Sequence, residues 1–205
     1  MTRRRITICV ASILSIGAAL AIVFSWDSQP RYQGLKLSDW LVSFKGARTS
    51  SYRTVWPIEA EKAIRSIGTN GLPCLTKWVG YEKASWKVKL GAGYQKWPRW
   101  LVSKALANRL SYDHGERLGD NAVIAFRILG RDAAPSVPEL IVVLRDRQRP
   151  AASRRAIICL GSIGPAARPA LPYLKEIAAG SQSPAALDAL MAIQNIEPRD
   201  IQKSF

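Results

Sequence analysis

Hydrophobic and small residues recur at helical spacing along much of the chain, most regularly between Ala156 and Leu174. In the first half of this stretch they occupy positions i, i+3, i+4 and i+7, which is one face of an α-helix; they are Ala156, Cys159, Leu160 and Ile163. Gly164 and Pro165 then end the helix. Pro169 begins a second helix with its own apolar face. The stretch therefore predicts two helices joined by a short turn.

The same two-helix pattern occurs in three further places, which are found by aligning the chain on a glycine. Small or apolar residues stand eight, five, four and one positions before Gly68, Gly130 and Gly164, and a proline stands five positions after each. In a last copy, Gln194 takes the place of the glycine, and the residues expected on the core face are Ala186, Ala189, Leu190 and Ile193. The steps from copy to copy are 62, 34 and 30 residues. Self-similarity at a short period is typical of proteins built from stacked repeats.

Elementary chemistry accounts for this unit. Small residues on the first helix let its neighbour approach closely, and the glycine adopts a positive φ that caps the helix. The prolines Pro135 with Pro138, and Pro169 with Pro172, fit the first turn of the second helix, where backbone N–H groups lack helical partners anyway. Each pair leaves an apolar face uncovered, so we expect neighbouring pairs to stack.

The unit resembles the HEAT repeat, in the short form common in bacterial proteins. The resemblance rests on AIRSIGTNGLPCL (Ala63 to Leu75), AFRILGRDAAPSVPEL (Ala125 to Leu140) and the stretch described first, and it extends from about Ile58 to Ile196 with a gap in the middle. It implies an all-α, armadillo-like fold: a short α-solenoid of helix pairs. Most HEAT-like proteins are binding scaffolds, although some are DNA glycosylases or chromophore lyases, so the resemblance implies protein binding before catalysis.

The N-terminus predicts a transmembrane anchor over residues 1–26. Three arginines at positions 3–5 precede an uncharged, mostly apolar run of 19 residues, 6–24. As a helix, this run measures ~28 Å at about 1.5 Å per residue, close to the ~30 Å of a bilayer core. The arginines favour a cytoplasmic N-terminus, which places the solenoid outside the cytoplasm. The alternative is a signal peptide that is cleaved near Ala21 and releases a secreted protein.

The rest of the chain divides into a polar linker, 27–36, and the solenoid, 37–205. Within the solenoid, Leu37–Phe44 predicts a short helix, N-capped by Ser38, that covers the open end of the first repeat. An irregular section, 77–119, interrupts the repeats. We interpret residues 111–120 as a loop, with Asp120 or Asn121 capping the next helix.

Charge is unevenly distributed along this basic chain, whose formal net charge is +15. Residues 31–112 hold 15 Lys and Arg against 4 Asp and Glu, whereas residues 131–205 hold 10 against 7. This excess suits an anionic polymer or lipid surface, although it equally suits a well-solvated surface. The cysteines Cys9, Cys74 and Cys159 have no C-x-x-C spacing, so neither a zinc site nor a disulfide is expected.

The most unusual stretch is Lys77 to Trp100, where six aromatic residues alternate with lysines and arginines. Such a mixture stacks on bases or sugars while holding phosphates, and it also suits a lipid headgroup layer. Alternatively, the aromatic rings fill a core while the lysines extend into solvent. The candidate residues for binding an anionic surface are Lys77, Lys83, Trp86, Lys87, Lys89, Lys96, Trp97, Arg99 and Trp100.

Catalytic, metal and cofactor sites are not predicted. His114 is the single histidine, and a polar turn explains it and its acidic neighbours better than a metal site does. One histidine also makes most catalytic triads hard to assemble. We therefore expect a membrane-tethered, non-enzymatic scaffold that binds another protein. The alternatives are a binder of anionic polymer or lipid, and a nucleic-acid enzyme on a HEAT-like scaffold; the anchor argues against the enzyme, because an extracytoplasmic domain would not meet DNA.

The anchor hypothesis makes a direct prediction. Full-length protein is expected to stay in the membrane fraction after an alkaline carbonate wash, because a helix that spans the bilayer is not removed by disrupting ionic contacts. A soluble form whose N-terminus lies near Ala21 or Ile22, identified by mass spectrometry, would establish a cleaved signal peptide instead.

Overall fold

The computed structural model describes residues 29–43, 58–85, 113–180 and 184–198, and these residues are mostly helical. The expected all-α class is confirmed, apart from one small hairpin of two antiparallel strands. No helix in these four ranges has the length and hydrophobicity needed to cross a bilayer, and the predicted anchor, 1–26, lies outside them. The elements are β1 (Arg31–Tyr32), β2 (Leu35–Lys36), α2 (Leu37–Val42), α3 (Ile58–Ile67), η1 (Gly68–Gly71), α4 (Leu72–Val79), α7 (His114–Leu129), η3 (Gly130–Ser136), α8 (Val137–Arg145), α9 (Pro150–Ile163), η4 (Gly164–Ala170), α10 (Leu171–Ala179) and α11 (Pro184–Ile196).

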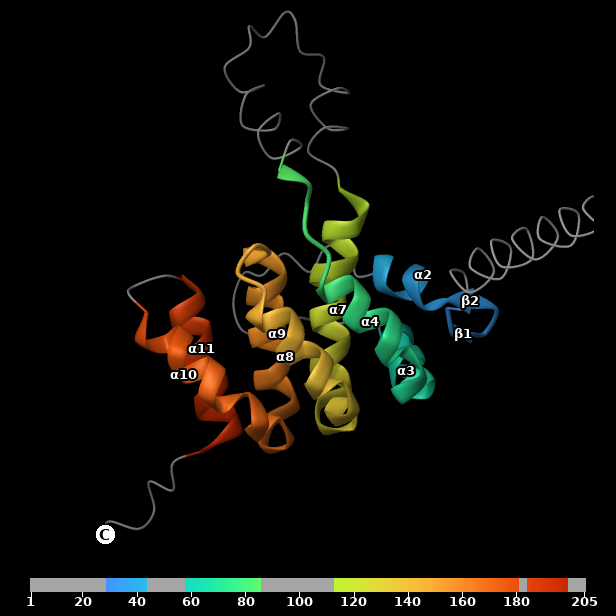
Figure 1. Cartoon of the computed structure of the whole chain (residues 1–205). Coiled ribbons are helices and arrows are strands. Elements are labelled where there is room, and N and C mark those ends of the chain that lie inside the picture. Colours follow the sequence, from blue (N-terminus) through green and yellow to red (C-terminus); the bar gives the residue numbers. More distant parts are fainter. Residues whose placement is uncertain (1–28, 44–57, 86–112, 181–183, 199–205) are drawn as a thin grey trace, which may run out of the picture.

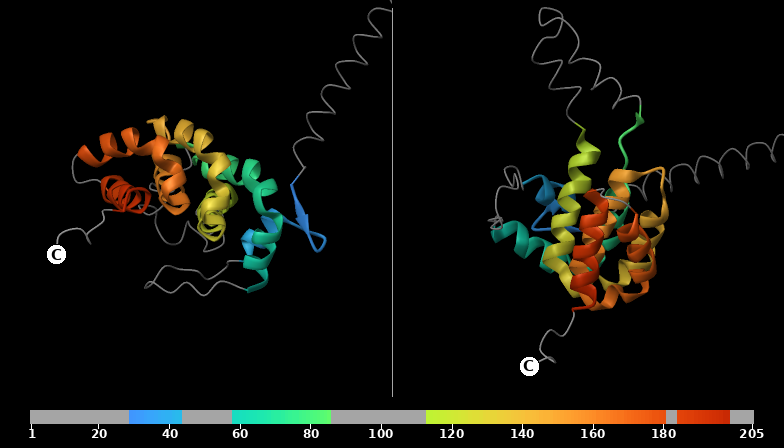
Figure 2. Two further views of the ribbon diagram at one scale, coloured as in Figure 1. Left: turned by 90° about the horizontal axis from the view of Figure 1, so that it is seen from below. Right: turned by 90° about the vertical axis from the view of Figure 1, so that its left-hand side faces the viewer.

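The helices form a row with α2 and the hairpin at one end and α10 and α11 at the other (Figure 1). The first helices of the pairs, α3, α7, α9 and α11, pack successively against one another in one layer. The second helices, α4, α8 and α10, lie in the other layer (Figure 2). Each second helix packs mainly against the next first helix: α4 on α7, α8 on α9 and α10 on α11. Each helix pair is therefore packed against the next first helix in the row.

The glycine at the end of each first helix has the predicted backbone conformation. Gly68, Gly130 and Gly164 have φ values of 55°, 53° and 72°, a region that side chains with a Cβ rarely adopt. The expectation that Pro169 begins the second helix is wrong, because a 3₁₀ segment (η1, η3 or η4) comes between the two helices of each pair. The φ that proline imposes suits this tighter helix, so Pro135 and Pro169 lie inside 3₁₀ segments.

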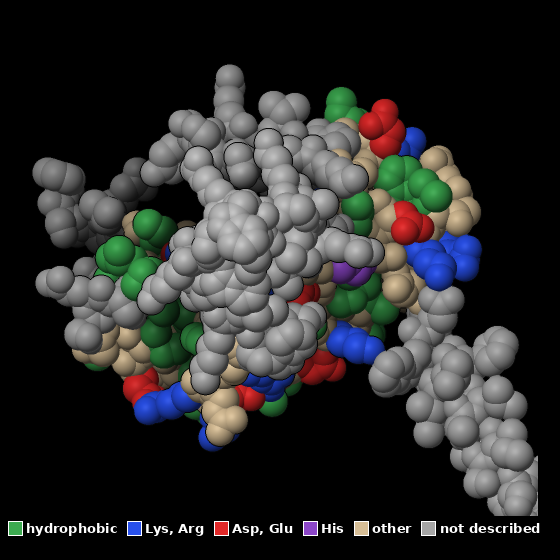
Figure 3. Space-filling view, turned by 90° about the horizontal axis from the view of Figure 1, so that it is seen from above, with side chains coloured by type: hydrophobic (Ala, Val, Ile, Leu, Met, Phe, Trp, Pro, Cys, Tyr) green, Lys and Arg blue, Asp and Glu red, His purple; other side chains and the backbone are tan. Residues whose placement is uncertain are grey.

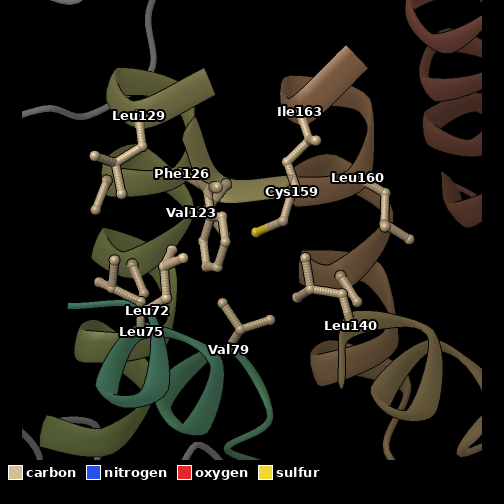
Figure 4. Close-up of a cluster of buried hydrophobic side chains, with 14 of the residues drawn as sticks. Leu72, Leu75, Val79, Val123, Phe126, Leu129, Leu140, Cys159, Leu160 and Ile163 are labelled. Carbon is tan, nitrogen blue, oxygen red and sulfur yellow. The ribbon is translucent and has the colours of Figure 1, made fainter. Parts of the chain in front are cut away.

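Small side chains let the first helices pack closely. Ala60, Ala122 and Ala156 are completely buried at the same position, eight residues before the glycine, of three successive copies. Figure 4 shows the layer between α7 and α9, where Phe126 and Cys159 point toward one another above the leucines of α4. At the next contact the fit is tighter still, because a Cβ on Gly161 would lie 2.9 Å from the Cα of Ala192.

The N-terminal end of the row is covered as expected. Leu37 and Leu41 of α2 are completely buried, and α2 packs on α3 and α7. The helix ends at Val42 rather than at Phe44, and its N-cap residue is Lys36, so the prediction of Ser38 as N-cap is wrong. The reason is the hairpin, which forms within the predicted linker 27–36 and delivers the chain directly into α2.

Helix α7 begins earlier than the sequence suggested. Residues 114–120 are its first two turns rather than a loop, and Asp120 and Asn121 lie inside it. Asp113 is the actual N-cap, since its carboxylate accepts hydrogen bonds from the backbone N–H groups of Gly115 and Glu116 at 3.0 and 3.3 Å. The irregular section predicted over 77–119 is therefore shorter, because its first residues belong to α4 and its last to α7.

The glycine conformation gives a stability prediction. Gly164→Ala is expected to lower the free energy of unfolding by about 1–3 kcal/mol, because alanine must adopt a strained φ there. Gly180→Ala is the matched control: Gly180 has φ −73°, and an added Cβ would make only ordinary contacts. It should leave stability unchanged or raise it by up to about 1 kcal/mol. Urea denaturation followed by circular dichroism measures both, and equal midpoints would contradict the role assigned to Gly164.

Candidate functional site

The predicted anionic-surface site can be examined only at its start. Lys77 is an exposed residue of α4, and Lys83 is half-buried with its Nζ 3.5 Å from a carboxylate oxygen of Glu116. The other candidates lie outside the described residues: Trp86, Lys87, Lys89, Lys96, Trp97, Arg99 and Trp100. The structure therefore assigns Lys83 a contact within the protein and leaves the main part of the predicted site untested.

The segment that leaves α4, Gly80–Lys83, is held by two arginines from distant parts of the chain. The Arg155 guanidinium donates to the Tyr81 carbonyl oxygen at 2.7 Å and to Asp120 at 2.8 Å. Its neighbour Arg149 donates to the Gly80 carbonyl oxygen at 3.1 Å. The Arg155 side chain is nearly buried, and a buried charge is tolerated only when it is paired in this way. Arg149 lies between two helices in the sequence, where an exposed side chain is expected. The contact with Gly80 leaves it half-buried instead.

Tyr81 lies at the centre of this contact, which we call the Tyr81 anchor and define as Gly80–Lys83 with its partners on α7 and α9. The Tyr81 hydroxyl donates to Asp113 at 2.9 Å, on the same carboxylate that caps α7. Gly115 leaves space for the ring, since a Cβ there would lie 2.5 Å from it. Glu82 accepts the N–H of Ala152 in the first turn of α9 at 3.0 Å. The anchor therefore satisfies polar groups at the starts of two helices and serves the fold.

Burial raises the pKa of the Tyr81 hydroxyl, and its hydrogen bond to the ionised Asp113 raises it further because it favours the protonated phenol. The described cysteines behave as core residues. Cys159 is buried and Cys74 half-buried, both are free thiols, and burial raises both pKa values. A thiol with a raised pKa stays protonated at neutral pH and is a poor nucleophile.

Metal ligation finds no support in the described part of the chain, where no three His, Cys, Asp or Glu side chains are placed to hold an ion. His114 is an exposed residue at the first position of α7, beside the N-cap.

The exposed surface of α11 differs from that of the earlier first helices. The positions seven and four residues before the glycine are at most 8% exposed in α7 and α9, where they hold Val123, Phe126, Ile157 and Leu160. In α11 the same two positions hold Leu187 and Leu190, which are 62% and 53% exposed. Met191 beside them is 64% exposed. We call Leu187, Leu190 and Met191 the end ridge. Among the described residues no helix follows α11 to cover it.

Sequence reasoning placed Leu190 on the core face of the last copy, and this assignment is wrong. The core face of α11 consists of Ala186, Ala189, Ala192 and Ile196, which pack on α9 and α10. Leu190 occupies the position that contacts the following pair in earlier copies. The sequence contained the information needed to find this, because aligning α11 with α7 and α9 identifies the positions that are buried only when another helix pair follows.

Two hollows flank the end ridge. One, of about 440 Å³, lies among α7, α9 and α11, with Arg127, Ile158 and Met191 in its wall. The other, of about 1040 Å³, lies beside α10 and α11, with Leu190 and Ile193 in its wall. Figure 3 shows hydrophobic side chains gathered at the end of the molecule that α10 and α11 form.

Helix α11, which carries the end ridge, has few charged residues. Among the described α-helices of eight or more residues, α11 is the only one without Lys or Arg. Its single charge, Asp188, is paired with Arg154 of α9. On the other flank, Lys175 of α10 lies 3.7 Å from Glu197. Helix α11 itself therefore carries little net charge, whereas the exposed Arg127 of α7 lies in the wall of the hollow beside Met191.

Comparison of the chain with protein-family models, with curated proteins and with solved structures found no match.

The Tyr81 anchor predicts a specific pH dependence. Because the folded-state pKa of Tyr81 is raised, its contribution to stability is fully present below the unfolded-state pKa of about 10 and is lost as pH rises through the higher folded-state value. The urea midpoint of the native protein should therefore fall more steeply above about pH 10 than that of Tyr81→Phe. Tyr173→Phe, remote from Asp113, is the control and should titrate like the native protein. Parallel curves for all three proteins would remove Tyr81 from the anchor.

Proposed function

We propose that this protein is a HEAT-like α-solenoid that acts as a non-enzymatic scaffold and binds a protein partner through the end ridge. The observation that carries the proposal is the exposure of Leu187 and Leu190 at positions that are buried in the two preceding first helices. A contiguous apolar patch on a protein surface often marks a site of contact with another protein.

The repeated geometry supports the solenoid. Three first helices end at a glycine of positive φ, each is followed by a 3₁₀ segment and a second helix, and each second helix packs on the next first helix. Most contacts between helices join neighbouring pairs, as in a solenoid. The Tyr81 anchor, which joins the end of α4 to α9, reaches beyond the neighbouring pair. The earlier resemblance of these stretches to HEAT repeats is consistent with this geometry and belongs to the same proposal.

Burial of the end ridge would contribute part of the free energy of binding a partner. Fully burying a leucine or methionine side chain contributes about 1.5–3 kcal/mol, and each ridge side chain is already about two-fifths buried. Three such residues would contribute roughly 3–5 kcal/mol before the entropic cost of association, about 4–15 kcal/mol, is subtracted, so further contacts around them are needed. The three residues would form the central contact of an interface whose rim is polar.

The location of the scaffold follows from the N-terminal run 6–24. We propose that it tethers the solenoid to the membrane, with the N-terminus in the cytoplasm and the solenoid on the opposite side; a secreted protein is the alternative if the run is a cleaved signal. An anionic polymer or lipid partner is less well supported than a protein, because helix α11 carries little net charge and Lys83 is paired with Glu116.

The test is a comparison of co-purified proteins. Full-length tagged protein, solubilised from membranes in mild detergent, is compared with Leu187→Ser/Leu190→Ser/Met191→Ser. The triple variant should keep its circular dichroism spectrum and lose its specific partner, because the three side chains are exposed. Val142→Ser is the control: Val142 is 67% exposed on α8, away from the end ridge. A partner retained by the triple variant would refute the proposed contact.

A further inference from the structure

We draw no further inference here: the strongest candidate, the exposed apolar face of α11 with the hollow beside Arg127 and Met191, belongs to the end ridge already described, and nothing among the described residues shows what covers it.

Discussion

Close packing between successive first helices is the constraint on which the rest of the molecule depends. It requires small side chains: Ala63, Ala125 and Ala156 are completely buried, and Gly161 has no room for a Cβ against Ala192. Dispersion contacts fall off steeply with distance, so a larger residue would separate the helices and lose many contacts at once. Once two first helices are in contact, the positive φ of the glycine that follows directs the chain into the 3₁₀ segment and the second helix.

Polar contacts are added where this packing leaves backbone groups without partners. The Tyr81 anchor joins the end of α4 to the starts of α7 and α9, across 74 residues of sequence between Tyr81 and Arg155. Its cost is the burial of a guanidinium group, which is offset by hydrogen bonds to Asp120 and to a backbone carbonyl. Removing one partner would leave a buried charge uncompensated, so the anchor stabilises one arrangement of three helices rather than a single contact.

In a row where each helix pair covers the pair before it, the helix at the end of the described row has no following pair to cover it. Among the described residues α11 is the last of the first helices, and it exposes Leu187 and Leu190 where α7 and α9 bury the residues at the same positions. The chain covers the opposite end with α2. The proposed scaffold role would cover an apolar surface that the described part of the chain leaves exposed.

The sequence by itself determined the helix pairs, the glycines between their helices and the covering helix that carries Leu41, because helical periodicity and backbone preferences act locally. It did not identify Leu37, which is buried beside Leu41. It misplaced the start of the second helices at Pro169, since proline is compatible with both 3₁₀ and α-helical first turns. It also missed the N-cap Asp113, which lies in a polar run with several candidates. Only the tertiary structure decided that Lys83 and Arg149 make contacts within the protein, because their partners are distant in sequence. The exposure of Leu190 was likewise decided by the tertiary structure, because no helix among the described residues covers that face of α11.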